Sequence, residues 1–384
     1  MYSRFFAPPP QSFFLFGPRG TGKSTLISGF FKSARVIDLL DPETFQSLSA
    51  SPNRLTGFID GSPKVKHWII DEVQRIPELL PLIHQLIEKN KQLHFVLTGS
   101  SARKLRRTSS DLLGGRALEC HLHPFLASEL GKDFDLDRAL TIGMLPLVLA
   151  APRAEATLKS YLALYMQTEV VAEGLVKSLP TFSRFLEAIS FSQGSLINFS
   201  AIGRDCGVDR KTIQAYVAIL EDLLVAFRLP VFTKKAKREL VTHEKFYYFD
   251  SGVYRAIRPT GPLDQPQEID GAALETLVIQ QLRAWASYRE EGEKLYFWRS
   301  RGGTEVDVVI YGKRGLWAIE IKNSGKVRPE DLAGLREFGQ DYPMSERILL
   351  YRGKHREMVS GVTCIPVGEF LQQLSPEKDL TGAG

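Results

Sequence analysis

The stretch FFLFGPRGTGKST, residues 13–25, decides the fold of the first part of the chain. An apolar run at residues 12–16 predicts a buried strand, and the following GPRGTGKST fits the pattern GxxxxGK[ST] ahead of a predicted helix. Glycines at this spacing let backbone N–H groups turn inward around phosphates, at the positive end of the helix that follows. The pattern therefore predicts a site for the phosphates of a nucleotide.

Each residue of this loop has an expected role. Lys23 is expected to reach the β- and γ-phosphates of ATP, and the Ser24 hydroxyl to ligate Mg²⁺. The alternative is a glycine-rich helix start without a ligand. The residues expected to contact the nucleotide are Gly17, Pro18, Arg19, Gly20, Thr21, Gly22, Lys23, Ser24 and Thr25.

Two further strand ends carry polar residues that suit hydrolysis. WIIDE, residues 68–72, is apolar up to two adjacent carboxylates. Asp71 is expected to hold the Mg²⁺ water shell and Glu72 to polarise the attacking water, although acids at a strand end can simply face solvent. Thr98 and Ser100, after the strand HFVL, are predicted to sense the γ-phosphate, although Thr-Gly-Ser is also ordinary turn chemistry.

Short apolar runs alternate with helix-length segments as far as about residue 130. This alternation predicts an α/β fold with a doubly wound parallel sheet. The predicted buried strands lie at residues 12–16, 34–41, 66–72, 93–101 and 117–122.

The order of the motifs resembles a known family. GPRGTGKST, IIDEVQRIP, LTGSSARKL and LLGGRALECHLHPFLASEL, at residues 17–25, 69–77, 97–105 and 112–130, look like bacterial and archaeal AAA-type P-loop ATPases whose sensor strand reads TGS. The resemblance continues to about residue 149. It implies that Arg116 is a γ-phosphate-sensing or finger arginine, with Arg103 as the alternative, whereas from the sequence alone either could equally be a surface charge. Because such ATPases often need a neighbour's arginine, it also implies a possible homo-oligomer.

The pattern becomes helical from about residue 135 to 230. Residues 197–229 have a helix-turn-helix profile, with a short helix at 200–206, a turn at Gly207-Val208, and a longer helix from Arg210 that Asp209 caps. The longer helix is expected to bury one face, because apolar residues recur at helical spacing. These residues are Ile213, Val217, Leu220 and Leu224.

DNA is the partner expected for this segment. Lys211, Thr212 and Gln214 lie near the start of the second helix, where a recognition helix presents groups to bases or phosphates. The family resemblance supports a winged-helix module here, and a helical bundle that packs against the ATPase is the alternative. Four basic residues could line phosphates at a following wing: Lys234, Lys235, Lys237 and Arg238.

Strands return from about residue 246, around a helix predicted at 272–290. Asp307 lies within the apolar strand EVDVVI, and Glu320 and Lys322 share one face of AIEIK. A buried unpaired carboxylate costs several kcal/mol. Asp307 and Glu320 are therefore expected to share a Mg²⁺ ion, with Lys322 positioning water and Glu275 as a further acid.

This D…ExK pattern resembles the restriction-endonuclease-like (PD-(D/E)xK) fold, although Val306 stands where the name has proline. The resemblance implies an α+β nuclease domain. A hairpin with Glu and Lys facing solvent is the alternative, because such hairpins often produce the same short motif.

Composition limits the remaining possibilities. The chain has 384 residues, 43% of them hydrophobic, which predicts two to three folded domains. Its net charge of +5 allows anionic partners without requiring them. Three scattered cysteines argue against disulfides or structural zinc, and no apolar run reaches membrane-spanning length. We therefore expect a cytoplasmic protein with no membrane partner.

The sequence thus predicts three parts: a P-loop AAA-type ATPase domain at 1–134, a helical, winged-helix-like segment at 135–257, and a restriction-endonuclease-like domain at 258–384. The leading hypothesis is an ATPase that acts on DNA, with ATP and Mg²⁺ as cofactors and a possible Mg²⁺-dependent nuclease domain. The alternative is a nucleotide switch that binds DNA or a protein, in which the nuclease-like domain only recognises the partner.

Overall fold

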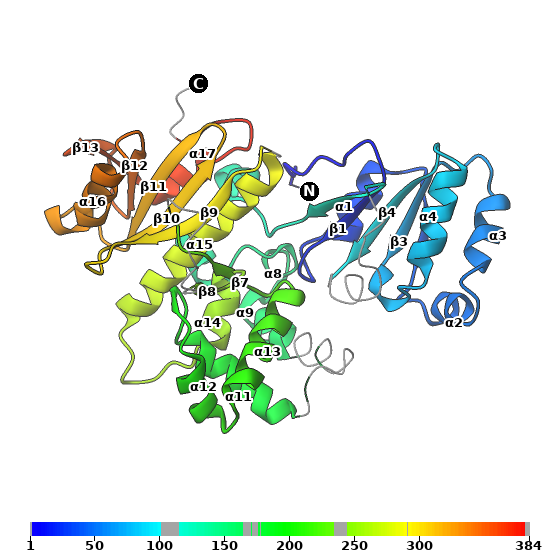
Figure 1. Ribbon diagram of the computed structural model, residues 1–384, viewed down its shortest axis with the longest axis horizontal. Coiled ribbons are helices and arrows are strands. Elements are labelled where there is room, and N and C mark those ends of the chain that lie inside the picture. The colour runs from blue at the N-terminus through cyan, green and yellow to red at the C-terminus, as the bar shows by residue number, and fades with distance from the viewer. Residues whose placement is uncertain are drawn as a thin grey trace. The chain divides into compact units, whose positions relative to one another are not determined.

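The computed structural model describes residues 2–100, 115–163, 170, 176, 178–233, 244–289 and 291–380. The chain forms two compact units (Figure 1). We call Phe6–His123 with Asp222–Leu224 the N-terminal unit. The C-terminal unit contains Met1–Phe5, Pro124–Glu221 and Val225–Gly384.

The N-terminal unit is built on a five-stranded sheet in the order β2-β3-β4-β1-β5, in which every neighbouring pair is parallel. This sheet, with its helices, confirms the predicted parallel α/β fold. Its strands are β1 (Phe13–Phe16), β2 (Arg35–Asp38), β3 (His67–Asp71), β4 (His94–Gly99) and β5 (Leu118–His121). The main helices are α1 (Lys23–Phe30), α2 (Pro42–Ala50), α3 (Arg54–Asp60) and α4 (Leu79–Lys89), with the 3₁₀ turn η1 (Val73–Arg75).

Two of the strands predicted to be buried are largely exposed. In β2 only Ile37 is buried, and β5 has no buried residue. Both strands lie at an edge of the sheet, so each has a neighbouring strand on one side only. An apolar run does not distinguish an edge strand from a central one.

The first part of the C-terminal unit is helical, as predicted. Its helices are α6 (Ala127–Leu130), α7 (Leu136–Ile142), α8 (Pro146–Leu149), α9 (Ala154–Tyr161), α11 (Leu179–Ser190), α12 (Phe199–Cys206), α13 (Arg210–Asp222) and α14 (Ser251–Ile257), and a 3₁₀ turn η2 (Gly131–Asp133) follows α6. Three short strands form an antiparallel sheet in the order β6-β8-β7. They are β6 (Ser195–Leu196), β7 (Ala226–Leu229) and β8 (Lys245–Tyr248).

The predicted helix-turn-helix segment has the expected helix bounds within one residue. Gly207 ends α12 with a φ of 69°, a conformation that favours glycine. The carboxylate of Asp209 accepts the N–H of Thr212 at 2.7 Å, so it caps α13 as predicted. Ile213, Val217 and Leu220 are buried and Leu224 is half-buried.

The second part of the C-terminal unit packs helices on a six-stranded mixed sheet in the order β13-β14-β12-β11-β10-β9 (Figure 1). This arrangement confirms its α+β character, while the endonuclease-like fold remains a prediction. The strands are β9 (Lys294–Arg299), β10 (Glu305–Gly312), β11 (Gly315–Lys322), β12 (Glu346–Tyr351), β13 (Glu357–Val359) and β14 (Val362–Pro366). The helices are α15 (Pro266–Arg289), η4 (Pro329–Leu332), α16 (Ala333–Asp341) and α17 (Val367–Gln373).

The long helix α15 begins six residues earlier than predicted. Proline, glycine and aspartate are frequent from Arg258 to Gly271, a composition typical of loops. Pro266 instead starts the helix, where its missing N–H costs nothing, and Gly271 lies inside it.

Asp250 joins α7 to α14 within the helical part. Its buried carboxylate accepts N–H groups from Met144, Gly252 and Val253 at 2.8 to 3.2 Å. Gly143, with a φ of 76°, leaves room for the carboxylate, because a Cβ there would lie 1.8 Å from Asp250 Oδ1. Burial raises the pKa of Asp250 to about 6.

This raised pKa predicts a pH dependence of stability. The folded state binds the Asp250 proton more tightly than the unfolded chain, whose Asp pKa is about 3.9. Its contribution is present below about pH 4 and is lost as the pH rises through about 6. Asp250→Asn is expected to remove this change from the free energy of unfolding measured across pH 4–7. An unchanged pH profile in the variant contradicts the assignment.

The first residues of the chain belong to the C-terminal unit. The buried guanidinium of Arg4 pairs with buried Glu129 at 3.0 Å, and the N–H of Phe5 donates to Glu129 at 2.7 Å. The Tyr2 hydroxyl donates to Asp133 at 2.9 Å. The chain therefore starts in one unit, crosses to the other after Phe5, and returns at Pro124.

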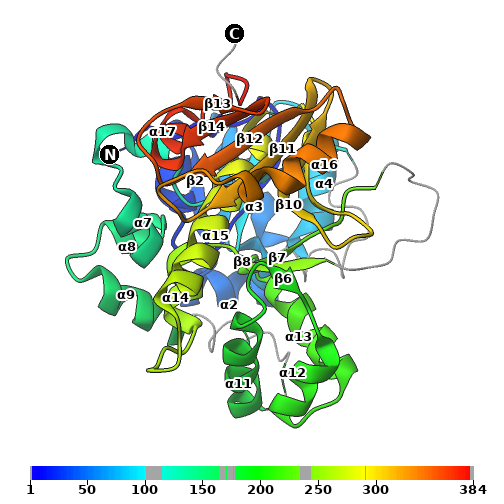
Figure 2. The same cartoon turned by 90° about the vertical axis from the view of Figure 1, so that its left-hand side faces the viewer.

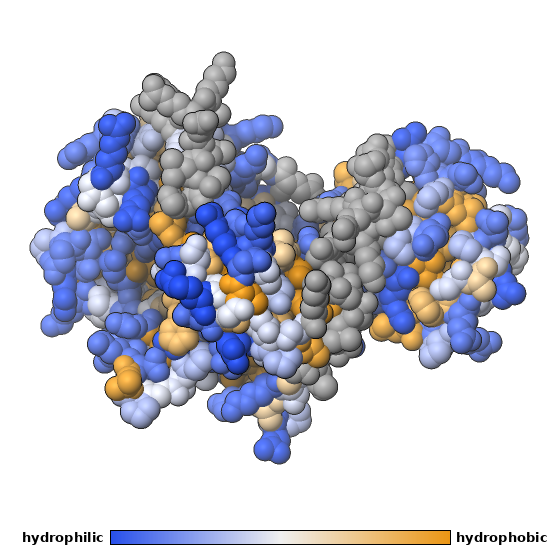
Figure 3. Space-filling model, turned by 60° about the horizontal axis from the view of Figure 1, so that its bottom comes forward, coloured by the Kyte–Doolittle hydropathy of each residue, from blue (hydrophilic) through white to orange (hydrophobic). Residues whose placement is uncertain are grey.

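Figure 3 shows one face of the molecule, on which most of the coloured residues are hydrophilic and hydrophobic ones form scattered patches. Among the residues that the structure describes, no helix combines the length and the apolar character needed to cross a membrane.

Candidate functional site

The loop between β1 and α1 is shaped by glycine. Gly20 and Gly22 have φ values of 83° and 87°, which favour glycine. A Cβ on Gly17 would lie 2.4 Å from the carbonyl oxygen of Leu122. The buried Lys23 donates from Nζ to the carbonyls of Gly17, at 2.7 Å, and Pro18, at 3.3 Å. The lysine ammonium thus lies over the predicted phosphate loop.

Asp71, at the end of β3, contacts residues of α1 and β4 at this edge of the sheet. Because β4 lies between β1 and β3, the end of β3 lies near the start of α1, the helix that follows β1. Ser24 Oγ donates to Asp71 Oδ2 at 2.8 Å, and the Thr98 hydroxyl donates to Asp71 Oδ1. A serine hydroxyl beside an aspartate is a donor set that fits Mg²⁺, with phosphate oxygens and water completing its shell.

Glu72 is held by a residue that the sequence analysis missed. Glu72 has a φ of 59°, an uncommon value for a residue with a side chain. The Gln74 amide donates to Glu72 Oε2 at 2.5 Å and to Ser100 Oγ at 3.1 Å, and Ser100 Oγ lies 3.3 Å from Glu72 Oε2. A Cβ on Gly99 would lie 2.7 Å from Gln74 Oε1. The only signal for Gln74 was a polar residue two positions after the predicted strand end at Glu72.

Arg116 is not brought to this site. It precedes β5, at the amino end of a strand that runs parallel to β1, whereas the phosphate loop follows the carboxyl end of β1. Arg116 pairs with Glu88 near the end of α4 at 2.5 Å. The alternative, Arg103, and the predicted wing residues Lys234, Lys235, Lys237 and Arg238 lie outside the described residues.

The predicted D…ExK residues come together in the C-terminal unit. Val308 pairs with Ile319 across the antiparallel β10 and β11, so continuing the register places Asp307 opposite Glu320. Asp307 Oδ2 accepts the N–H of Ile321 at 2.8 Å. Lys322 Nζ contacts Glu320 Oε1 at 2.6 Å. The β-bulge between Val306 and Val309 is a feature that often re-aims side chains at functional sites.

The sequence analysis missed three residues of this cluster, Lys245, Tyr247 and Glu305. The buried Lys245, at the start of β8, lies 3.2 Å from Glu305 Oε2 and 3.8 Å from Glu275 Oε1. The Tyr247 hydroxyl donates to Glu275 Oε1 at 2.6 Å. No sequence signal pointed to Lys245 or Tyr247, because their segment is far from the acids along the chain.

Burial and mutual repulsion shift the pKa values of the acids. Burial, followed by the charge of Asp307, raises the pKa of Glu275 to about 7 and that of Glu320 to about 8. Burial lowers the pKa of Lys245, but the charges of Glu275, Asp307 and Glu305 raise it more, so its net shift is upward. The cluster therefore favours a cation in its midst.

The arrangement does not fit a resident divalent cation. Within the described ranges, no three His, Cys, Asp or Glu side chains are grouped so as to hold a metal ion. The Lys245 ammonium lies between Glu275 and Glu305, and Lys322 already pairs with Glu320. Glu320 Oε2 is buried without a hydrogen-bond partner.

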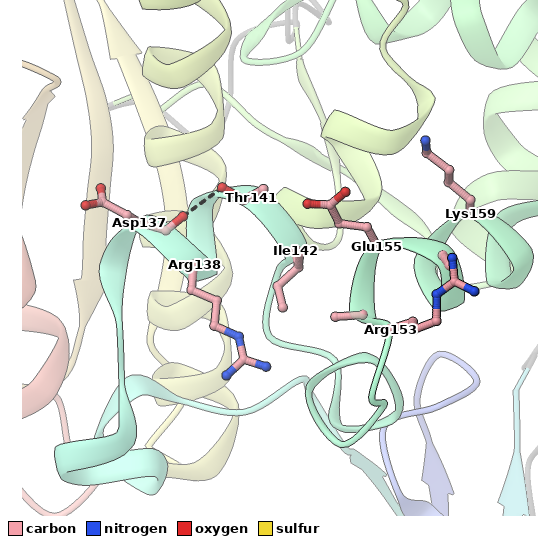
Figure 4. Close-up of a pocket in the computed structure, with 9 residues that line it drawn as sticks. Asp137, Arg138, Thr141, Ile142, Arg153, Glu155 and Lys159 are labelled. Carbon is pink, nitrogen blue, oxygen red and sulfur yellow. Dashed lines mark hydrogen bonds between the residues drawn. The ribbon is translucent and has the colours of Figure 1, made fainter.

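A hollow of about 830 Å³ lies between α7 and α9 (Figure 4). Arg138, Arg153 and Lys159 line it together with Asp137 and Glu155. In Figure 4 the three basic side chains lie apart rather than meeting at one point. This mixed lining does not select one class of ligand.

The start of α13 presents a polar surface. Arg210, Lys211 and Gln214 are exposed, whereas Ile213 and Tyr216 face the interior. Figure 2 shows α12 and α13 as neighbours beside α11. The exposed side chains match the positions at which a recognition helix contacts DNA.

Three family models match the chain in succession. Residues 10–131 match an AAA domain. Residues 133–264 match a domain of unknown function, DUF8612, and residues 270–370 match another, DUF4143.

Curated relatives are distant. Uncharacterised proteins of Mycobacterium tuberculosis and Mycobacterium bovis are each 26% identical over 368 residues, covering 93% of this chain and 80% of theirs. An uncharacterised protein of Haemophilus influenzae is 24% identical over 208 residues, covering 49% of this chain and 52% of its own.

Similarity to solved structures is weak. The replication initiator DnaA bound to AMPPCP and single-stranded DNA is 16% identical with a TM-score of 0.28, and AMPPCP-bound DnaA from Aquifex aeolicus is 15% identical with a TM-score of 0.29. Each match covers 55% of this chain and 82% of the other. A Vibrio cholerae protein is 13% identical with a TM-score of 0.22, covering 94% of this chain and 95% of that one.

Proposed function

We propose that the chain binds and hydrolyses ATP with Mg²⁺ and uses this cycle to act on DNA, and the match of residues 10–131 to an AAA domain supports the first part of this proposal. The observation that carries the ATPase assignment is the position of Asp71, bonded to both Ser24 and Thr98 beside the glycine loop. These contacts support Asp71 as a ligand of Mg²⁺ beside the phosphates.

The side chains of the site have distinct roles in this proposal. Lys23 and the N–H groups of the loop hold the phosphates, and Ser24 and Asp71 hold Mg²⁺, which supplies positive charge when bound. Glu72 orients the attacking water and takes its proton as the water oxygen bonds to the γ-phosphorus and the bond to ADP breaks. Gln74 fixes the Glu72 carboxylate, and through Ser100 it links that carboxylate to the tip of β4.

Arg116 has a role here only between copies of the chain. Its own phosphate loop lies at the opposite end of β1, so it can reach a γ-phosphate only from a neighbouring protomer. We therefore propose a homo-oligomer formed in the presence of ATP. Mass measurement of the Glu72→Gln variant with ATP tests it, and a monomer under saturating ATP contradicts it.

Helices α12 and α13 support the action on DNA. They form a helix-turn-helix pair, and the antiparallel strands β7 and β8 follow it, as in a winged helix. The exposed Lys211 and Gln214 stand on the first turns of α13, the part that enters the major groove in such modules.

Lys211→Ala is expected to weaken duplex DNA binding and to reduce the slope of log affinity against log salt by about 1, since one phosphate contact is lost. Fluorescence anisotropy with a labelled duplex from 50 to 200 mM salt measures both quantities. The exposed Lys354→Ala serves as the control. Wild-type affinity and slope in Lys211→Ala contradict the proposed DNA surface.

The segment 258–384 acts as a recognition module in this proposal. The competing function is metal-dependent DNA cleavage. It would use Asp307, Glu320 and Lys322, with Glu275, and the close approach of these residues around β10 and β11 favours it. An assay on single- and double-stranded DNA with Mg²⁺ or Mn²⁺, with and without ATP, separates the two. Cleavage that Asp307→Ala abolishes while sparing ATP hydrolysis establishes the nuclease.

A further inference from the structure

Lys245 is a buried lysine that ATP hydrolysis does not use. Its side chain is 5% exposed, and it lies on β8, outside the segment 270–370 that supplies the acids around it. Its Nζ lies 3.2 Å from Glu305 Oε2, 3.8 Å from Glu275 Oε1 and 5.4 Å from the centre of the Phe297 ring. Burying an ammonium is costly unless it is paired, so these contacts fix its position.

The charges around Lys245 are unequal. The cluster holds four carboxylates, Glu275, Glu305, Asp307 and Glu320, against three basic side chains, Lys245, Lys322 and Arg299, and Arg299 Nε lies 3.4 Å from Glu305 Oε1. Lys322 is engaged with Glu320. The Arg299 side chain is 46% exposed, so Lys245 is the buried cation beside Glu275 and Glu305.

Several of the oxygen atoms that a metal would need already have partners. A hard divalent cation takes about six oxygen ligands. Glu275 Oε1 accepts from Tyr247, Asp307 Oδ2 accepts from the backbone of Ile321, and Glu320 Oε1 contacts Lys322. Each of these contacts engages one oxygen of its carboxylate, and the other oxygen of Glu320, Oε2, is buried without a hydrogen-bond partner.

We infer that the ammonium of Lys245 stands in for a divalent cation, so that the cluster of Glu275, Glu305, Asp307 and Glu320 excludes metal while Lys245 remains in place. The cation comes from the helical part of the unit and the acids from the part that follows it, so one ion-pair network joins the two. This inference does not depend on ATP hydrolysis.

Mn²⁺ binding to the nucleotide-free full chain tests the inference. All proteins carry Lys23→Ala, which removes the phosphate-loop lysine, and free Mn²⁺ is followed by electron paramagnetic resonance. With Lys245 intact, we expect the same weak binding with and without Asp307→Asn. Lys245→Met removes the charge from a long side chain, and is expected to tighten Mn²⁺ binding about tenfold or more. Adding Asp307→Asn should then abolish the gain.

The controls separate the lysine's charge from general effects. Lys245→Arg keeps the positive charge and is expected to bind no more Mn²⁺ than the parent, and the exposed Lys294→Met is expected to change nothing. Saturable binding to the parent that Asp307→Asn removes overturns the inference. So does a folded Lys245→Met variant without added Mn²⁺ binding. If Lys245→Met does not fold, the comparison of the parent with Asp307→Asn decides alone.

Discussion

Lys23→Ala is expected to lower the rate of ATP hydrolysis by about a hundredfold or more, and to weaken ATP binding. The buried ammonium lies over the glycine loop, where it faces the charge that develops as the γ-phosphate is transferred. Loss of one such preorganised donor typically costs about 10²- to 10³-fold in rate. Phosphate release and calorimetric titration with ATP measure the two effects.

A second variant separates binding from chemistry. Glu72→Gln removes the base but leaves the loop intact, so it should bind ATP normally and lose turnover. The exposed Glu78→Gln, six residues further along the chain, is the matched control and should behave like the wild type. Wild-type turnover in Lys23→Ala contradicts the ATPase site.

Trp285→Ala is expected to lower the free energy of unfolding of the C-terminal unit by about 3–5 kcal/mol. Trp285 is fully buried in α15, and its indole N–H donates to the carbonyl of Ser375 at 3.1 Å. The substitution leaves a large cavity and an unpaired carbonyl. Urea unfolding followed by circular dichroism measures the loss.

Two control variants are compared with Trp285→Ala in their free energy of unfolding. Trp285→Phe fills most of the cavity and should retain most of the stability, whereas Met344→Ala, at a residue 74% exposed, should change it by less than about 1 kcal/mol. A loss for Trp285→Ala no larger than that for Met344→Ala contradicts the stabilising role of the buried Trp285 side chain.

The phosphate site is the part of the molecule most fully predicted from sequence. The glycine loop is a local structure, in which residue spacing alone sets the backbone. Asp71 and Thr98 could be anticipated because carboxyl ends of parallel strands meet at one edge of the sheet. The role of Gln74 could not be anticipated. A single polar residue after a strand forms no periodic pattern, so nothing in the sequence indicates that its side chain bonds to both Glu72 and Ser100.

The C-terminal cluster shows where prediction from sequence stops. Asp307, Glu320 and Lys322 lie on adjacent strands and share a motif, so their proximity was predictable. Lys245 reaches the same cluster through tertiary packing of a segment about 30 residues before Glu275, and no local pattern encodes such a contact. The short helices α14, α16 and α17 were missed because seven to nine residues give too few turns to establish a period.

The contacts of the first residues with Glu129 and Asp133 can form only late in synthesis. They involve Tyr2, Arg4 and Phe5. These first residues leave the ribosome before the ATPase domain, yet their partners emerge only after it is complete. Domains generally fold as units as they emerge, so Phe6–His123 can fold while the residues before it still lack partners. When Glu129 appears, its pairing with Arg4 brings together the two chain ends of a domain that is already folded.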